Sequence, residues 1–380
     1  GIILLGEGWQ MGNHADGVTP SDQYHADRLP GYAFFNDSLR DLLKGSVFDK
    51  ADRGWISGVK NTELAWDIFS NITGAQTVRN NLNPGQSVVY NEAHDNLTLW
   101  DKLLNTNPAD SEELLIKRHT LATSIQMLSN GMTFVHAGQE FLRTKGGDHN
   151  SYISPDSVNF LDYDRSAEYP EAFAYFKAML ELRKSEPLFR LNNYEEINKA
   201  YALAEDQQGD LLHYTISDPA SGQLKYIVVL NADTEAKTVT IPQGSYVAIV
   251  ASGSVETDEA KAPRVDDKTT YEVAPLSASV LMVSKPVAPA PTAADPAATT
   301  VPASTSESSA ADNANDANNA DDANDAGNAD DASNAGNNGL RNALIGIGLV
   351  TALGLIVSFT QKQRFPFLDE GDNKKPKTKN

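Results

Sequence analysis

Cysteine is absent from the 380-residue sequence. Its absence excludes a disulfide scaffold and any metal site that depends on thiolate ligands. It is typical of exported bacterial proteins that avoid thiol chemistry. A secretory signal is also lacking at the start of the chain, because the apolar stretch 1–5 is short and no basic segment precedes it. We therefore expect a C-terminal fragment whose export signal lies upstream.

Basic residues are missing from the stretch 286–339, which consists mainly of Ala, Asp, Asn, Ser, Thr and Pro. Its acidic residues contribute a large share of the formal net charge of −20. Such a composition has little to bury, so residues 286–341 are predicted to form a disordered acidic linker. Because the negative charge is concentrated there, nucleic acid is not expected as a partner.

One long apolar run follows this linker. It extends from Ala343 to Phe359 without a charged residue, with Arg341 before it and a group of lysines after it. We predict a transmembrane anchor at 342–360 and, from the positive-inside rule, a basic cytoplasmic tail at 361–380. The rest of the chain would then lie on the extracellular face of the plasma membrane, in an expected Gram-positive bacterium. A buried core helix is the alternative for this run.

The first half of the chain alternates strand and helix patterns, which is typical of an α/β domain with parallel strands. The predicted strands are 2–5, 32–35, 87–91 and 132–136, and the predicted helices are 37–43, 61–72, 111–130 and 169–186. These four strand–helix repeats correspond to half of an eightfold (β/α)8 TIM barrel, which we assign to residues 1–190.

From residue 191 the pattern changes to short strands separated by turn residues. The predicted strands are 211–217, 224–231, 236–241, 245–251 and 277–283. Residues 191–285 are therefore predicted to form an all-β sandwich, packed behind the α/β domain.

Two strands of the first domain run into acidic residues. The first strand is followed by Gly6-Glu7-Gly8-Trp9, and the third by Asn91-Glu92-Ala93-His94-Asp95-Asn96. Barrel enzymes place catalytic groups at this end of parallel strands, and carboxylates there suit the hydrolysis of glycosidic bonds. Each motif has a plainer alternative. Glu7 would also fit an ordinary loop, and Asp95 or Asn96 would also fit the N-cap of a helix at 97–104.

Taken together, these motifs resemble the type I pullulanases, which are debranching enzymes of the α-amylase superfamily (glycoside hydrolase family 13). The resemblance lies in residues 6–9, 90–102 and 136–145, and in the short segments 34–37, 147–152 and 154–159. It covers residues 1–190 in motif and 190–285 in general layout. It implies the C-terminal half of a catalytic barrel, which hydrolyses α-1,6 branches of pullulan, starch or glycogen with retention of configuration.

The resemblance also implies roles for single residues. Glu7 would be the general acid/base, and Asp95 would stabilise the transition state. Sugar contacts would come from Trp9, His94, Asn96 and Tyr152. The nucleophilic Asp of this family would lie on a strand upstream of residue 1, so the chain alone is expected to be inactive.

The expected partner is a branched α-glucan, and no cofactor is expected to be required. The sequence leaves a structural calcium ion open. His136 and Glu140 lie four residues apart, but the pair spans a strand-to-loop junction, so we predict no metal site there. Two alternatives to a pullulanase remain, namely an isoamylase-like or other hydrolase of the same superfamily, and a noncatalytic carbohydrate-binding surface protein.

Overall fold

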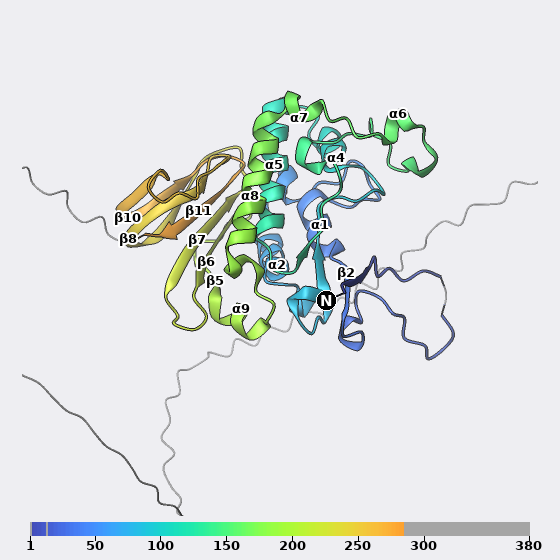
Figure 1. Ribbon diagram of the computed structural model, residues 1–380, viewed down its shortest axis with the longest axis horizontal. Coiled ribbons are helices and arrows are strands. Elements are labelled where there is room, and N and C mark those ends of the chain that lie inside the picture. Colours follow the sequence, from blue (N-terminus) through green and yellow to red (C-terminus); the bar gives the residue numbers. More distant parts are fainter. Residues whose placement is uncertain (1, 13, 285–380) are drawn as a thin grey trace, which may run out of the picture. The chain divides into compact units, whose positions relative to one another are not determined.

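The structure is a computed structural model that describes residues 2–12 and 14–284. An α/β portion comes first in the chain and an antiparallel β-sheet follows it (Figure 1). The linker, transmembrane anchor and basic tail predicted at 286–341, 342–360 and 361–380 lie outside the described residues. Within the described residues, no helix is both long and apolar enough to cross a membrane.

The α/β portion contains a parallel sheet of four strands in the order β1–β2–β3–β4. Its strands are β1 (Leu4–Gly6), β2 (Tyr32–Phe35), β3 (Ser87–Val89) and β4 (Met132–Thr133). Each overlaps a predicted strand. Because the strands run in the same direction, the residues that follow them lie along one edge of the sheet.

The four predicted helices are confirmed to within two residues at each end. They are α1 (Asp37–Lys44), α2 (Thr62–Ile72), α5 (Glu112–Leu128) and α8 (Pro170–Ser185). The first three begin at a side-chain cap, because Asn36, Asn61 and Ser111 each accept a hydrogen bond from a backbone N–H of the first turn.

Shorter helices connect these elements. The α-helices are α3 (Gln76–Arg79), α4 (Leu99–Thr106), α6 (Asp156–Asn159), α7 (Arg165–Glu168) and α9 (Tyr194–Ala200). The 3-10 helices are η1 (Ala26–Arg28), η2 (Trp55–Ser57), η3 (Pro84–Gln86), η4 (Gln139–Phe141), η5 (Ser151–Ile153) and η6 (Pro187–Arg190). Most of them are one turn long, which is too short for a periodic pattern to predict.

The second part of the chain forms a seven-stranded antiparallel sheet in the order β10–β8–β11–β7–β6–β5, with β9 paired to β8. The strands are β5 (Tyr201–Leu203), β6 (Leu211–Ser217), β7 (Leu224–Asn231), β8 (Lys237–Ala251), β9 (Ser254–Val255), β10 (Arg264–Val273) and β11 (Ser277–Val283). Three of the predicted strands, at 211–217, 224–231 and 277–283, have the observed bounds.

The prediction of two separate strands at 236–241 and 245–251 is wrong. Residues 236–241 and 245–251 belong to the single strand β8, which pairs with β10 over its first part and with β11 over its last part. The pairing with β10 shifts register opposite Gly244, where the sheet bends. Val239 and Val265 consequently pack on Leu211 and Ile227 in a core enclosed by one continuous sheet.

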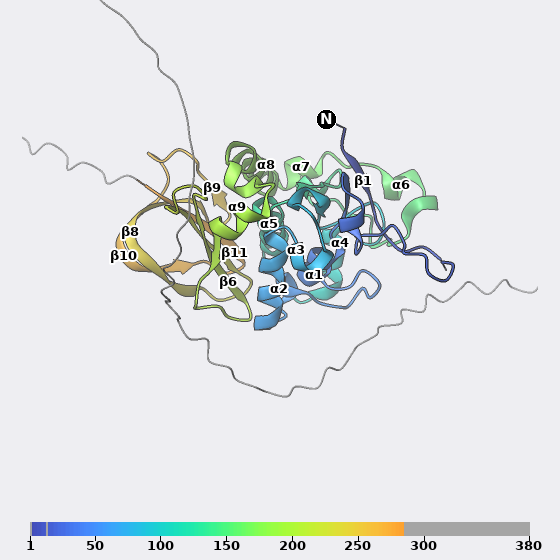
Figure 2. The ribbon, with the colours of Figure 1, turned by 90° about the horizontal axis from the view of Figure 1, so that it is seen from below.

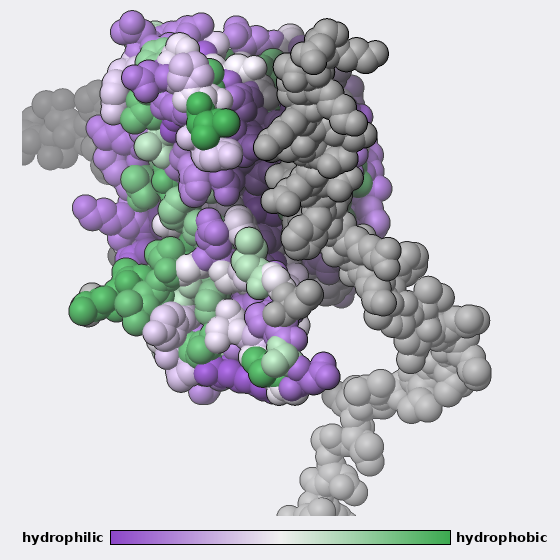
Figure 3. Space-filling model, turned by 90° about the vertical axis from the view of Figure 1, so that its right-hand side faces the viewer, coloured by the Kyte–Doolittle hydropathy of each residue, from purple (hydrophilic) through white to green (hydrophobic). Residues whose placement is uncertain are grey.

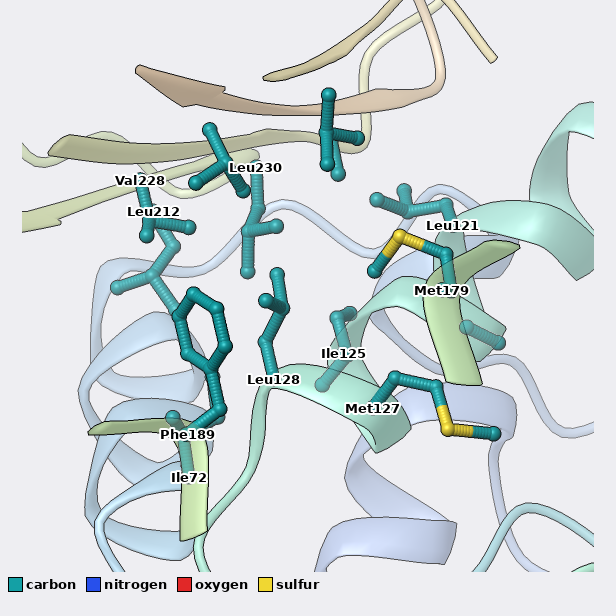
Figure 4. Close-up of a cluster of buried hydrophobic side chains, with 14 of the residues drawn as sticks. Ile72, Leu121, Ile125, Met127, Leu128, Met179, Phe189, Leu212, Val228 and Leu230 are labelled. Atoms are coloured by element: carbon teal, nitrogen blue, oxygen red, sulfur yellow. The ribbon is translucent and has the colours of Figure 1, made fainter. Parts of the chain in front are cut away.

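Helices α5 and α8 lie between the parallel and the antiparallel sheet (Figures 1 and 2), and both contact the antiparallel one. Figure 4 shows the core at this junction, where side chains from both parts of the chain point toward one another. These side chains are 0–1% exposed and include Ile72, Leu121, Ile125, Leu128, Met179, Phe189, Leu212, Val228 and Leu230. The α/β portion and the β-sheet therefore share one core. Burial of each of these side chains contributes about 1.5–3 kcal/mol to the free energy of folding.

Strand β1 is an edge strand of the described sheet, and its apolar residues are exposed. Ile2 and Ile3 are 90% and 67% exposed, and Leu4 and Leu5 are about half exposed. Figure 3 shows one side of the molecule, which is largely hydrophilic but carries a compact hydrophobic patch. An exposed apolar sheet edge is a template on which another strand can pair.

Candidate active site

Glu7, His94 and Asp95 come together at the C-terminal edge of the parallel sheet. Glu7 follows β1, whereas His94 and Asp95 follow β3. One ligand atom of each residue lies within 4.8 Å of those of the other two. His94 Nε2 is 3.5 Å from Asp95 Oδ1. The cluster therefore holds two carboxylates and an imidazole from residues 87 positions apart, which can exchange protons with one bound molecule.

A small pocket lies at this cluster, and four of the predicted site residues line it: Glu7, Trp9, Asp95 and Asn96. The other lining residues are Phe35, Arg40, Lys44, Val47, Tyr90 and Ala93. His94 and Tyr152 are not among them. Tyr152 lies in η5 with 76% of its surface exposed.

Asp37, the first residue of α1, connects the pocket walls. Its Oδ2 accepts hydrogen bonds from Trp9 Nε1 at 2.7 Å and Gln23 Nε2 at 3.1 Å. Its Oδ1 accepts from the Tyr90 hydroxyl at 2.5 Å and from Arg40 at 3.3 Å. With four donors on two oxygens, this carboxylate orients the Trp9 ring and has little capacity left for a substrate.

The segment between β3 and α4 carries His94, Asp95 and Asn96. Helix α4 begins at Leu99 and is capped by Thr98, whose hydroxyl accepts from the backbone N–H of Asp101. The alternative in which Asp95 or Asn96 caps a helix at 97–104 is therefore wrong. Asn96 has a φ of 63°, a left-handed conformation that Asn tolerates better than most residues.

A buried carboxylate, that of Glu92, holds this segment in place. Glu92 accepts a hydrogen bond from the backbone N–H of Leu99 at 2.5 Å and another from His136 Nδ1 at 2.7 Å. Burial raises the pKa of the Glu92 carboxyl, but the contacts with His136 and Leu99 outweigh it and the net pKa is lowered. An ionised Glu92 thus ties the two ends of the site segment together.

His136 is not available as a metal ligand. Its Nδ1 contacts Glu92, and its Nε2 accepts a hydrogen bond from Arg143 at 3.1 Å. Glu140 accepts from the backbone N–H of Gly138 at 2.9 Å. The pair spaced four residues apart therefore orders two loops, and the metal interpretation set aside on sequence grounds has no support from its geometry.

A metal ion needs several ligand atoms close together. Among the described residues, Glu7, His94 and Asp95 form the group of at least three acidic or His side chains that could bind one ion. A structural calcium ion prefers six to eight oxygen ligands. Two carboxylates and one imidazole do not supply such a set, so the cluster does not fit calcium.

Sequence reasoning missed the cations behind the pocket. Arg40 and Lys44 are 5% and 2% exposed, and they occupy adjacent turns of α1 beside the buried Leu39 and Leu43. Burial lowers the pKa of Lys44 to about 7. Basic residues on the apolar face of a helix are the signal that would have identified them.

Comparisons with known proteins agree on one family. Residues 147–284 match the family described as alpha-1,6-glucosidases, pullulanase-type, C-terminal. The chain is 38% identical over 203 residues to the pullulanase of Bacillus subtilis (52% of this chain, 28% of the relative). It is 27% identical over 318 residues to pullulanase A of Streptococcus pneumoniae (70% of this chain, 25% of the relative). The chain thus spans less than a third of these curated relatives.

A solved structure matches over a longer stretch. It is the type I pullulanase of Bacillus subtilis complexed with maltose, with 30% identity and a TM-score of 0.69. The match covers 75% of this chain and 40% of that one. The α/β portion followed by the β-sheet is thus a pullulanase-like fold, and the chain is similar to part of the type I pullulanases.

Proposed function

We propose that this chain provides the C-terminal half of the catalytic (β/α)8 barrel, and the β-domain behind it, of a retaining hydrolase of α-1,6-glucosidic branches. The observation that carries the proposal is the meeting of Glu7 and Asp95, whose carboxylates face one pocket. Pullulan, starch or glycogen would be the substrate. The relatives are pullulanases, and the solved homologue binds maltose.

In this proposal Glu7 protonates the oxygen of the leaving sugar, and Asp95 stabilises the positive charge that develops at the anomeric carbon. His94 and Asn96 bind sugar hydroxyls beside Asp95, and Trp9 packs against the sugar on the acceptor side. Tyr152 would join them from the exposed turn η5.

A retaining mechanism also needs a carboxylate nucleophile. Asp37 lies close by, but its oxygens already accept from Trp9, Gln23, Tyr90 and Arg40. Lone pairs held by four donors are poor nucleophiles. We therefore assign the nucleophile to no residue of this chain.

The half-barrel assignment draws support from the edge of the parallel sheet. The apolar residues of β1 are exposed, and a further strand pairing with β1 would bury them. Such pairing is what closure of the four strands into an eightfold barrel requires.

The test is the complete gene product that carries this chain, assayed on pullulan with maltotetraose as a binding probe. Glu7→Gln should lower kcat by at least 10²-fold, because the amide cannot donate the proton, and should change maltotetraose affinity by no more than about threefold. Glu140→Gln, in the 3-10 helix η4, is the control and should retain activity within about twofold. A Glu7→Gln variant within tenfold of wild type would contradict the assignment.

We further propose that the segment from Ala343 to Phe359 anchors the protein in the plasma membrane, with the hydrolase outside. The support is the uncharged apolar run and the basic residues on its C-terminal side. Truncation after Ser284 should move activity from the membrane fraction to the medium. A tag at the C-terminus should resist protease added to intact cells; its removal would show the opposite topology.

A further inference from the structure

Two buried lysines hold the backbone on either side of Asp95. Lys145 Nζ donates a hydrogen bond of 2.8 Å to the carbonyl oxygen of His94. Lys44 Nζ makes a longer contact, 3.5 Å, with the carbonyl oxygen of Leu97. The residues are 3% and 2% exposed. The segment that presents Asp95 to the pocket is therefore held by a lysine at each end.

Neither ammonium group has a carboxylate at ion-pair distance within the part of the chain that the structure describes. Burial lowers the pKa of both lysines, to about 7 for Lys44. Burying an amine without a counter-ion is costly, and apolar residues would fill the same volume at lower cost. The hydrogen bonds that these lysines donate to backbone carbonyls offset part of that cost.

Lys145 is itself fixed to the helix that follows the site segment. Asp101 of α4 accepts hydrogen bonds from the Lys145 backbone N–H at 2.8 Å and from the Thr144 hydroxyl at 2.5 Å. The Lys145 side chain also donates to Ser151 Oγ at 3.2 Å. One lysine thus joins α4, the backbone of His94, and the turn that carries Tyr152.

We propose that Lys145 and Lys44 are positioning residues that hold the Asp95 carboxylate in the place needed beside the anomeric carbon. The inference rests on the proposed function, since it assigns a purpose to the placement of Asp95. A displacement of about 1 Å in a reacting group can cost on the order of 10² in rate. Lys145, with the shorter hydrogen bond, should matter more than Lys44.

The experiment compares Lys145→Met and Lys44→Met in the complete gene product, with kcat and KM measured on pullulan below the unfolding temperature of each variant. Met keeps an unbranched side chain, one atom shorter than that of lysine, and removes the donor. We expect kcat to fall at least tenfold for Lys145→Met and at least threefold for Lys44→Met, with KM changed less than threefold. Should Lys145→Met fail to fold, Lys145→Gln is one bond shorter and should show the same loss.

Lys102 provides a matched control. It is 1% exposed, burial lowers its pKa, and its Nζ donates to the carbonyl oxygens of Ser46 and Asp49. Those carbonyls flank Val47, which lines the pocket, but their loop carries no residue that is proposed to act on or bind the sugar. Lys102→Met should therefore lower the unfolding temperature as the other variants do, while kcat stays within about twofold of wild type.

Loss of stability without loss of kcat in folded Lys145→Met and Lys44→Met would overturn the inference, and so would an equal loss of kcat in Lys102→Met. If Glu7→Gln abolishes turnover in the same assay, either result leaves the proposed function standing. A wild-type product without activity on pullulan would overturn both, because no reaction would remain for Asp95 to serve.

Discussion

The Tyr90 hydroxyl donates a 2.5 Å hydrogen bond to Asp37, although the two residues are 53 positions apart in the chain. Burial raises the pKa of Tyr90, so the phenol remains a donor at neutral pH. Arg40 donates to the Tyr90 oxygen at 2.5 Å, and Trp9 donates to the other oxygen of Asp37. Asp37 thereby joins β3, α1 and the loop after β1 into one wall of the pocket.

Asp37→Asn should disturb this wall more than its size suggests. The amide group turns one acceptor into a donor, which then faces the N–H of Trp9 or the hydroxyl of Tyr90. We expect a stability loss of about 1–3 kcal/mol and at least a tenfold fall in kcat/KM on pullulan. Asp41→Asn is the control, since among the described residues both of its carboxylate oxygens accept hydrogen bonds from Arg40 only. Equal effects of both changes would contradict the role of Asp37 in holding the pocket wall together.

Gly8→Ala should displace Glu7 and Trp9. Gly8 has a φ of +71°, and an added Cβ would lie 2.6 Å from the buried ring of Phe34. Gly6→Ala is a closely matched control, because its Cβ would meet nothing within 4 Å. We expect at least a tenfold loss of kcat for Gly8→Ala and less than a twofold change for Gly6→Ala. Full activity of Gly8→Ala would mean that the loop relaxes without moving Glu7.

His119 should make the folded protein sensitive to mild acid. Burial lowers its pKa from 6.5 to about 4, and its Nε2 has no hydrogen-bond partner among the described residues. Between about pH 6.5 and pH 4 this histidine is therefore protonated in the unfolded chain but not in the folded one. Its contribution to the free energy of unfolding is complete above pH 6.5 and is lost as the pH falls. The loss from pH 7 to pH 5 should be about 2 kcal/mol.

Thermal unfolding at pH 7 and pH 5 measures this effect. His119→Gln should flatten the difference between the two pH values, whatever it does to stability at pH 7. Glu92 has a lowered pKa, so its contribution is lost only below its ordinary value of 4.5, outside this window. An unchanged pH dependence in His119→Gln would assign the acid sensitivity to another group.

Arg183 should be among the most costly side chains to remove. Its guanidinium donates to four carbonyl oxygens, those of Met127, Ser129, Gly131 and Phe189, at 2.6–2.9 Å. Arg183→Met would leave buried carbonyls without donors, and we expect a loss of about 3 kcal/mol or more in the unfolding free energy. Lys199→Met breaks only an exposed pair with Glu195 and should cost no more than about 0.5 kcal/mol. Chemical denaturation of both variants makes the comparison.

Some of the candidate site could be predicted from sequence because it follows the ends of strands. Glu7 and Asp95 were found as acidic residues after apolar runs, and parallel strands bring such positions to one edge. Arg40 and Lys44 were missed although they lie on the apolar face of α1, and Lys145 was missed because nothing local distinguishes it from a solvent-exposed cation. Their role depends on the carbonyl or hydroxyl that each one meets, and those partners lie 6 to 53 positions away.

The amino-acid sequence by itself determined the four long helices and most strands, since apolar period and N-cap residues act within a few positions of the chain. Asn36, Asn61 and Ser111 begin α1, α2 and α5 for that reason. Only the tertiary structure decided that β8 is one bent strand, because its two halves take different partners, β10 and β11. It likewise decided that Asp37 faces Trp9, since hydrogen bonds between distant residues form only after packing has removed the water that would compete for them.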